Sequence, residues 1–140
     1  MLGNIVEADY TSETADGRGK MIPEALARLS RVVCADTEML TKQELVDIAR
    51  YVYEQQIKQI IDGLTKVYTN AKRGASDKVP VVVTGLGRNF LARKAAEKLA
   101  VDAVIDLGTL LPKQAVLATP AVGVALMTAS KLTGEPLTWT

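Results

Sequence analysis

The apolar and polar positions divide the chain into a helical first half and a second half that mixes strands and helices. Residues 7–20 are polar and rich in turn-forming residues, which predicts an irregular loop. Pro23 suits the first turn of a helix, and the apolar positions after it recur at helical spacing. A helix is therefore expected from Pro23 to near Asp36.

The strongest helical pattern in the chain comes next. Thr41 and Glu44 form a capping-box pair, which marks a helix start, and the helix is expected to end before Gly74. Gln55 and Gln56 interrupt the apolar side and Gly63 loosens it, so a kink near the middle is expected. The apolar positions along one side are Leu45, Ile48, Ala49, Val52, Ile60, Leu64 and Val67.

The hydrophobic period changes after the polar turn at 70–78. Residues 79–84 and 101–107 are short, β-branched runs, typical of strands buried on both faces. A helix capped by Asn89 is expected between them, and a nearly all-apolar helix is expected over about 120–132. The order strand, helix, strand predicts a parallel pair joined by a crossover.

Two strands make a small sheet, because open sheets usually contain about four to six. Either residues 1–10 and 109–119 add strands, or the chain is one piece of a larger protein, and we favour the second alternative. The sequence thus predicts an α/β fold in which long helices precede a parallel βαβ unit. We expect one domain over 1–140 with three parts: a loop (1–22), a helical part (23–73) and a βαβα part (79–140).

Composition excludes several kinds of partner. The chain has 140 residues with 17 basic and 16 acidic side chains, a net charge of +1, and 4% aromatic residues. This balance provides no basic surface for nucleic acid or an anionic membrane, and few rings for stacking on bases. Residues 1–20 lack the apolar core of a signal peptide, and no apolar run is long enough to span a bilayer. We expect a cytoplasmic protein.

The sequence contains no histidine and one cysteine, Cys34. A Ser-His-Asp or Cys-His nucleophile, a His-bearing metal site and a multi-cysteine zinc site therefore cannot be built from this chain. We expect neither zinc nor haem. Cys34 itself is expected to be a small buried apolar residue in a reducing compartment. Any general acid or base must come from Asp, Glu, Lys or Tyr.

The clearest candidate site is the turn in which Gly85 and Gly87 follow the first predicted strand. Glycines at a strand end let a ligand approach the backbone, and the next helix offers unpaired N–H groups to a phosphate. A tight turn without a ligand is the alternative. Asp106 resembles the ribose-binding acid of a dinucleotide fold, but Phe90 replaces the third glycine, which argues against that class.

A second candidate lies in the polar loop, in the string Asp16-Gly17-Arg18-Gly19-Lys20. Two cations among glycines can hold an anion, and an arginine can bind phosphate through two N–H groups. The alternative is a solvated turn whose charges face water.

Four segments in this order resemble the hydantoinase/oxoprolinase-like family that is linked to tetrahydromethanopterin C1 transfer and includes an enzyme of methanofuran biosynthesis. They are LGNIVEADYTSETADGRGK, EALARLSRVVCADTEML, VVVTGLGRNFLARKAAEKL and VLATPAVGVALM. The resemblance implies the actin-like, ribonuclease-H-like (ASKHA) fold. It also implies that the chain is the C-terminal portion, part of one lobe, with Gly85 and Gly87 beside the cleft between lobes and an N-terminal lobe missing.

The resemblance further implies a transferase that joins a phosphorylated aminomethylfuran to glutamyl-tyramine with loss of diphosphate. Asp16, Arg18 and Lys20 are then expected to bind substrate phosphate, with Asp16 orienting Arg18 or helping to hold Mg²⁺. Two alternatives stay open: an ATP-dependent hydantoinase/oxoprolinase-like or kinase-like protein of the same fold, and a non-catalytic binding or oligomerisation module. We expect the 140-residue chain by itself to be catalytically inactive.

Overall fold

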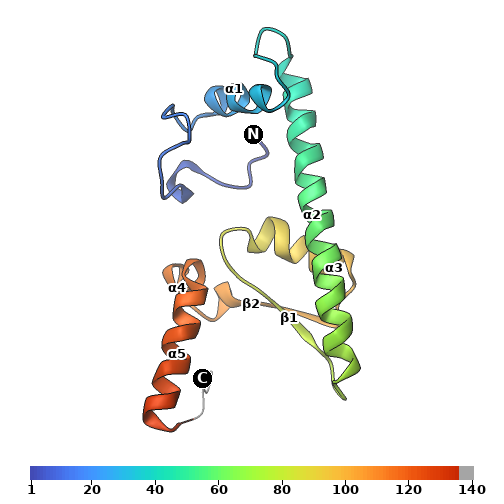
Figure 1. Ribbon diagram of the computed structural model, residues 1–140, viewed down its shortest axis with the longest axis vertical. Coiled ribbons are helices and arrows are strands. Elements are labelled where there is room, and N and C mark those ends of the chain that lie inside the picture. The colour runs from blue at the N-terminus through green and yellow to red at the C-terminus, as the bar shows by residue number, and fades with distance from the viewer. Residues whose placement is uncertain (136–140) are drawn as a thin grey trace. The chain divides into compact units, whose positions relative to one another are not determined.

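The computed structural model describes residues 1–135, so the end of the predicted 79–140 part lies outside the described residues. The chain divides into two compact units, Met1–Gln59 and a second that begins at Ile60. Figure 1 shows the helices and strands of both units in chain order by colour.

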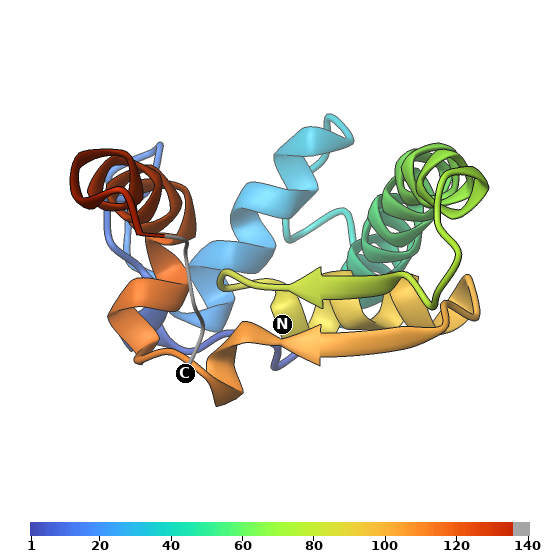
Figure 2. The same ribbon diagram turned by 90° about the horizontal axis from the view of Figure 1, so that it is seen from below.

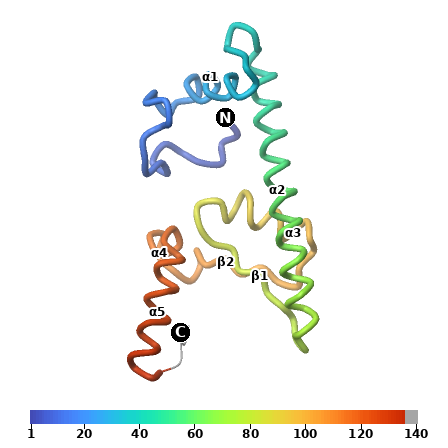
Figure 3. The backbone as a smooth tube through the Cα atoms, viewed as in Figure 1, coloured from blue at the N-terminus to red at the C-terminus, as the bar shows by residue number. Residues whose placement is uncertain are grey.

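The first unit opens with the predicted loop. Within it, Glu7–Asp9 forms a 3-10 turn, and the chain then leads into helix α1 (Ile22–Val32), as the backbone trace shows (Figure 3). The predicted end of α1 near Asp36 is wrong, because Cys34 adopts a left-handed conformation with a φ of 57°, which an α-helix cannot contain. Cys34 is also exposed, so the expectation of a buried thiol is wrong.

Helix α2 (Lys42–Arg73) begins with the predicted capping box. The Glu44 carboxylate accepts hydrogen bonds from the Thr41 N–H and hydroxyl, both at 2.8 Å, and the Glu44 N–H donates to the Thr41 hydroxyl at 3.3 Å. The helix is unbroken through Gly63 and ends before Gly74 as predicted, while the kink stays a prediction. Its buried residues are Leu45 and Ile57.

In the second unit, strands β1 (Pro80–Val83) and β2 (Ala103–Asp106) form the predicted parallel pair. The register places Val83 opposite Asp106, and Figure 2 shows both arrows pointing the same way. Among the described residues the sheet has these two strands, so neither 1–10 nor 109–119 adds one.

We expected both faces of strands β1 and β2 to be buried, and this prediction is wrong. Val83 is 2% exposed, whereas Val82, which points to the opposite face, is 50% exposed. Successive side chains of a strand alternate between faces, so one face of β1 is covered within the described residues and the other is largely bare. The covered side belongs to a small core that also contains Ala95, Ala96 and Val116.

The crossover helix begins two residues earlier than predicted. Gly87, and not Asn89, precedes the first helical residue, and the opening turn Arg88–Ala92 is π-helical before α3 (Arg93–Lys98) continues. The chain then forms two helices, α4 (Lys113–Leu117), which was not predicted, and α5 (Thr119–Thr133).

Helix α5 confirms the predicted apolar helix, and Gly134 ends it with a φ of 73°. In the part of the chain that the structure describes, α5 has no buried residue. None of the described helices combines the length and apolar character needed to cross a bilayer.

Candidate functional site

The carboxyl ends of β1 and β2 meet at one edge of the sheet, and the predicted glycine turn begins there. The Thr84 hydroxyl lies 2.6 Å from the Thr119 hydroxyl and 3.2 Å from the Val116 carbonyl. Thr119 in turn donates to the same carbonyl at 2.7 Å. This network fastens the end of β1 to the junction between α4 and α5, so the turn starts from a fixed point.

Gly85 and Gly87 lie together in this turn, as the sequence predicts. Gly85 has a φ of 81°, a left-handed conformation that favours glycine, and apart from its two chain neighbours no residue has an atom within 4 Å of where its Cβ would stand. A Cβ on Gly87 would stand 3.2 Å from the Leu91 side chain. The Gly85 carbonyl accepts hydrogen bonds from the Arg88 N–H at 3.4 Å and from the Arg88 guanidinium at 3.2 Å.

Asp106, at the end of β2, joins the turn to the crossover helix. Its carboxylate accepts hydrogen bonds from the Gly108 N–H at 2.8 Å, Arg88 Nε at 3.1 Å and Arg93 Nη2 at 3.0 Å. The Gly108 N–H, together with Arg93 and Arg88, holds the pKa of Asp106 below its ordinary value despite partial burial, which opposes the shift. Asp106 is therefore an ionised group paired with two arginines.

Sequence reasoning missed Arg88 and Arg93. The two are five residues apart, a spacing that an α-helix does not place on one side. The π-helical turn changes this, because its hydrogen bonds join residues five apart, and the Arg93 N–H donates to the Arg88 carbonyl. Such turns are rare and frequent at functional sites. An arginine directly after the second glycine was the available sequence signal.

The Asp16–Lys20 string forms a well-connected loop in the first unit. Asp16 Oδ1 accepts the Arg18 backbone N–H at 3.2 Å and Arg28 Nη1 at 3.1 Å, and Oδ2 lies 3.7 Å from Arg31 Nη1. Arg28 also donates to the Gly19 carbonyl at 3.0 Å. Asp16 thus orients the backbone of Arg18, and its side-chain partners are Arg28 and Arg31 of α1 together with Thr14.

Arg18 and Lys20, the two cations of this loop, differ in exposure: Arg18 is exposed, whereas Lys20 is half-buried. Lys20 Nζ stands 5.6 Å from the centre of the Tyr10 ring, within range of a cation–π contact. Arg18 is exposed, and among the described residues its guanidinium has no hydrogen-bond or ion-pair partner. Arg18 is therefore accessible to an anion, and Lys20 is partly accessible.

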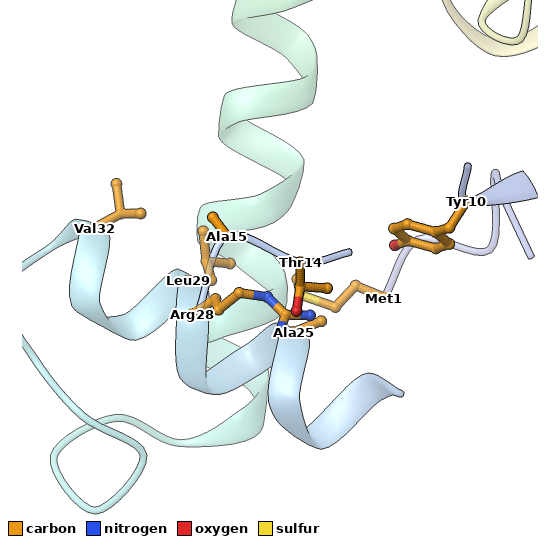
Figure 4. A pocket seen from close by; sticks show the side chains of 8 residues that line it. All are labelled: Met1, Tyr10, Thr14, Ala15, Ala25, Arg28, Leu29 and Val32. Carbon is orange, nitrogen blue, oxygen red and sulfur yellow. The ribbon is translucent and has the colours of Figure 1, made fainter. Parts of the chain in front are cut away.

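A pocket of about 380 Å³ opens beside this loop. Figure 4 shows Arg28 reaching across it, with the Tyr10 ring on one side and Val32 on the other. The lining is mostly apolar and consists of Met1, Tyr10, Thr14, Ala15, Ala25, Arg28, Leu29 and Val32.

The described residues do not themselves build a metal site. No three carboxylate or cysteine side chains gather in residues 1–135. The oxygens of Asp16 face two guanidinium groups, the Thr14 side chain and one backbone N–H, so this carboxylate, as positioned, does not fit as a Mg²⁺ ligand. Magnesium carried by substrate phosphates stays a prediction.

The predicted site residues thus form two groups, one in each unit: Asp16, Arg18 and Lys20 share a loop, and Gly85 and Gly87 share a turn. A model of the hydantoinase/oxoprolinase family matches residues 1–131, which contain both groups. The chain belongs to this family.

Two relatives carry the same name, "(4-{4-[2-(gamma-L-glutamylamino)ethyl]phenoxymethyl}furan-2-yl)methanamine synthase". The protein from Methanocaldococcus jannaschii is 38% identical over 134 residues, which cover 94% of this chain and 37% of the relative. The protein from Methanococcus vannielii is 28% identical over 137 residues, 96% of this chain and 60% of the relative. The chain therefore spans less than two thirds of either relative.

Proposed function

We propose that the chain forms part of a transferase that joins a phenol oxygen to a furylmethyl carbon with release of diphosphate. The observation that carries the proposal is the 38% identity with the M. jannaschii synthase over 94% of this chain. The product in the name of that relative contains a phenoxymethyl group on a furan, so its synthesis includes this ether bond.

The proposed reaction is balanced without an oxidant or a reductant. A bond forms between the phenol oxygen of glutamyl-tyramine and the methylene carbon of the phosphorylated aminomethylfuran. The bond from this carbon to the diphosphate oxygen breaks, and its electron pair leaves with the diphosphate. The phenol proton passes to a base or to water. Charge develops mainly on the leaving diphosphate, and fixed cations stabilise such charge most effectively.

Arg18 and Lys20 are the residues that we assign to the diphosphate in the first unit. Arg18 is exposed and Lys20 is half-buried, and the hydrogen bonds of Asp16 hold the loop that carries them. We assign Gly85 and Gly87 to the approach of a phosphorylated substrate in the second unit, with Mg²⁺ bound by the substrate phosphates. The partner we propose for the chain is the remainder of the polypeptide found in its longer relatives.

A second candidate is an ATP-dependent hydantoinase/oxoprolinase-like activity, which the family description favours. A chimeric enzyme separates the two candidates. In it, this chain replaces the matching 134-residue segment of the M. jannaschii synthase. The expected result is the ether product by mass spectrometry with an equal amount of diphosphate from the furan substrate. The proposal would be contradicted if the chimera makes no ether product but releases ADP when it is incubated with ATP and a hydantoin or 5-oxoproline.

A further inference from the structure

Arg88 and Arg93 have more hydrogen-bond donors than their partners use. A guanidinium carries five N–H groups. Arg88 donates from Nε to Asp106 and from Nη1 to the Gly85 carbonyl, while Arg93 donates from Nη2 to Asp106. Among residues 1–135, neither guanidinium makes a further hydrogen bond or ion pair. Most of these N–H groups are therefore available to a ligand.

The charges of this group do not cancel. Two guanidinium ions face one carboxylate, and the Asp106 side chain is 13% exposed, so the net positive charge lies in a partly shielded position. Electrostatic attraction is stronger where water is partly excluded. The arrangement consequently favours an anion.

Two glycines, Gly85 and Gly108, lie beside Arg88 and carry no Cβ. The space that a Cβ would occupy on Gly85 is open, and Gly108 lies under Arg88, where a Cβ would be 2.8 Å from Nε. Only glycine at position 108 lets the guanidinium lie this close to the chain. At Gly85 and Gly108, a ligand thus meets peptide groups that no side chain of the residue itself covers.

We propose that Arg88 and Arg93 bind a phosphoryl group at the carboxyl edge of β1 and β2, and that Asp106 is the positioning residue that holds the two guanidiniums. The planar guanidinium donates two parallel N–H groups to phosphate oxygens, which a lysine cannot do. The choice of a phosphoryl ligand rests on the proposed function, whereas the choice of residues rests on the geometry. The phosphoryl group belongs either to a small diphosphate or to a nucleotide.

The test is an NMR titration of the full chain, in which backbone amide shifts report where inorganic diphosphate or ATP binds. The expected shifts are largest at residues 84–88 and 106–109. Arg93→Gln is expected to weaken diphosphate binding by about tenfold or more, since bonds to a charged group are strong. Lys94→Gln is the matched control, because it removes one positive charge from the next, exposed residue, and it is expected to change binding by about twofold at most.

The two ligands separate the sources of the phosphoryl group. Equal affinity for diphosphate and ATP supports a small phosphorylated substrate, and tighter binding of ATP supports a nucleotide. Arg93→Lys keeps the ion pair with Asp106 and provides a second variant if Arg93→Gln unfolds; it is expected to lose part of the affinity.

The inference is overturned if Arg93→Gln and Lys94→Gln bind diphosphate with equal affinity, or if no backbone amide resonance shifts when ligand is added. It is also overturned if shifts are confined to residues 14–20. If shifts are confined to residues 14–20, the proposed function stands, because the Asp16–Lys20 loop still binds the diphosphate. Failure of the chimeric enzyme to make the ether would instead contradict the proposed function and leave the binding result intact.

Discussion

At the scale of single residues, one substitution is expected to have opposite effects at two glycines. Gly85→Ala places a Cβ on a residue with a φ of 81°, which costs roughly 1–2 kcal/mol. Gly63→Ala lies inside α2, where a Cβ meets no atom within 4 Å, and alanine stabilises a helix by about 0.5–1 kcal/mol over glycine. Urea unfolding of both variants measures the two changes. If Gly85→Ala raised the free energy of unfolding as much as Gly63→Ala does, the turn at Gly85 would accommodate a Cβ without strain.

Arg18 and Arg28 are expected to separate binding from folding. In the chimeric enzyme, Arg18→Ala should lower kcat/KM by about 10- to 150-fold, because a hydrogen bond to a charged group contributes roughly 1.5–3 kcal/mol and about 1.4 kcal/mol is a factor of ten. Arg18→Lys should recover part of this loss. Arg28→Ala should instead loosen the loop, since Arg28 bonds Asp16 and the Gly19 carbonyl.

Arg50→Ala is the control for the Arg18 variant, because it removes an exposed arginine of α2 that pairs with Asp47. Its kcat/KM is expected to stay within about twofold, as exposed ion pairs contribute little. A change of less than twofold for Arg18→Ala in a folded enzyme would show that the 16–20 loop is a solvated turn.

Single residues also mark where sequence reasoning stops. The glycines of the turn and the charged loop could be found from the sequence, because their chemistry lies in consecutive residues. The convergence of Arg88 and Arg93 on Asp106 could not, since it requires both a π-helical turn and the parallel register that brings β2 beside β1. The ion pairs of Asp16 with Arg28 and Arg31 were also missed, because they join a loop to a helix that follows it in the sequence.

At the scale of elements, Asp106 makes the connection between β2 and the crossover helix sensitive to acid. Its pKa is lower in the folded chain than the value of about 3.9 for an unfolded aspartate. Its contribution to stability is therefore present above about pH 4 and is lost as the pH falls through the folded-state pKa. The charged groups that face this carboxylate are the guanidiniums of Arg88 and Arg93.

Asp106→Asn is thus expected to be less stable than the natural chain at neutral pH, with a difference that narrows below about pH 4. Urea unfolding at a series of pH values measures this difference. Because Asp16 and Asp102 also have lowered pKa values, some acid sensitivity should remain in the variant. A difference independent of pH would mean that Asp106 does not act as a paired carboxylate.

The elements themselves were largely predictable, because helix starts, strand runs and the βαβ order depend on neighbouring residues. The capping box at Thr41 and the parallel pair are confirmed in this way. The end of α1 was not predicted, since nothing in a single cysteine indicates a left-handed backbone. Burial of the strands was predicted wrongly because it depends on what covers each face, which a local pattern does not contain.

At the scale of the whole molecule, the 140-residue chain by itself is expected to show no turnover. Stabilising a leaving diphosphate needs groups on several sides of the ligand, and this chain matches 37% of the M. jannaschii synthase. Diphosphate release by the purified chain measures this directly, with the chimeric enzyme as the positive control. Turnover by the chain that Arg18→Ala abolishes would contradict the expectation.

Cys34 gives the chain a property that the natural function need not use. It is exposed, it stands in the turn after α1, and it is the single sulfhydryl of the sequence. A maleimide fluorophore should therefore attach once per chain, at a known position in the unit that contains the Asp16–Lys20 loop. Stored in air without a reducing agent, the same thiol should oxidise and link molecules into covalent dimers, which a non-reducing gel would reveal.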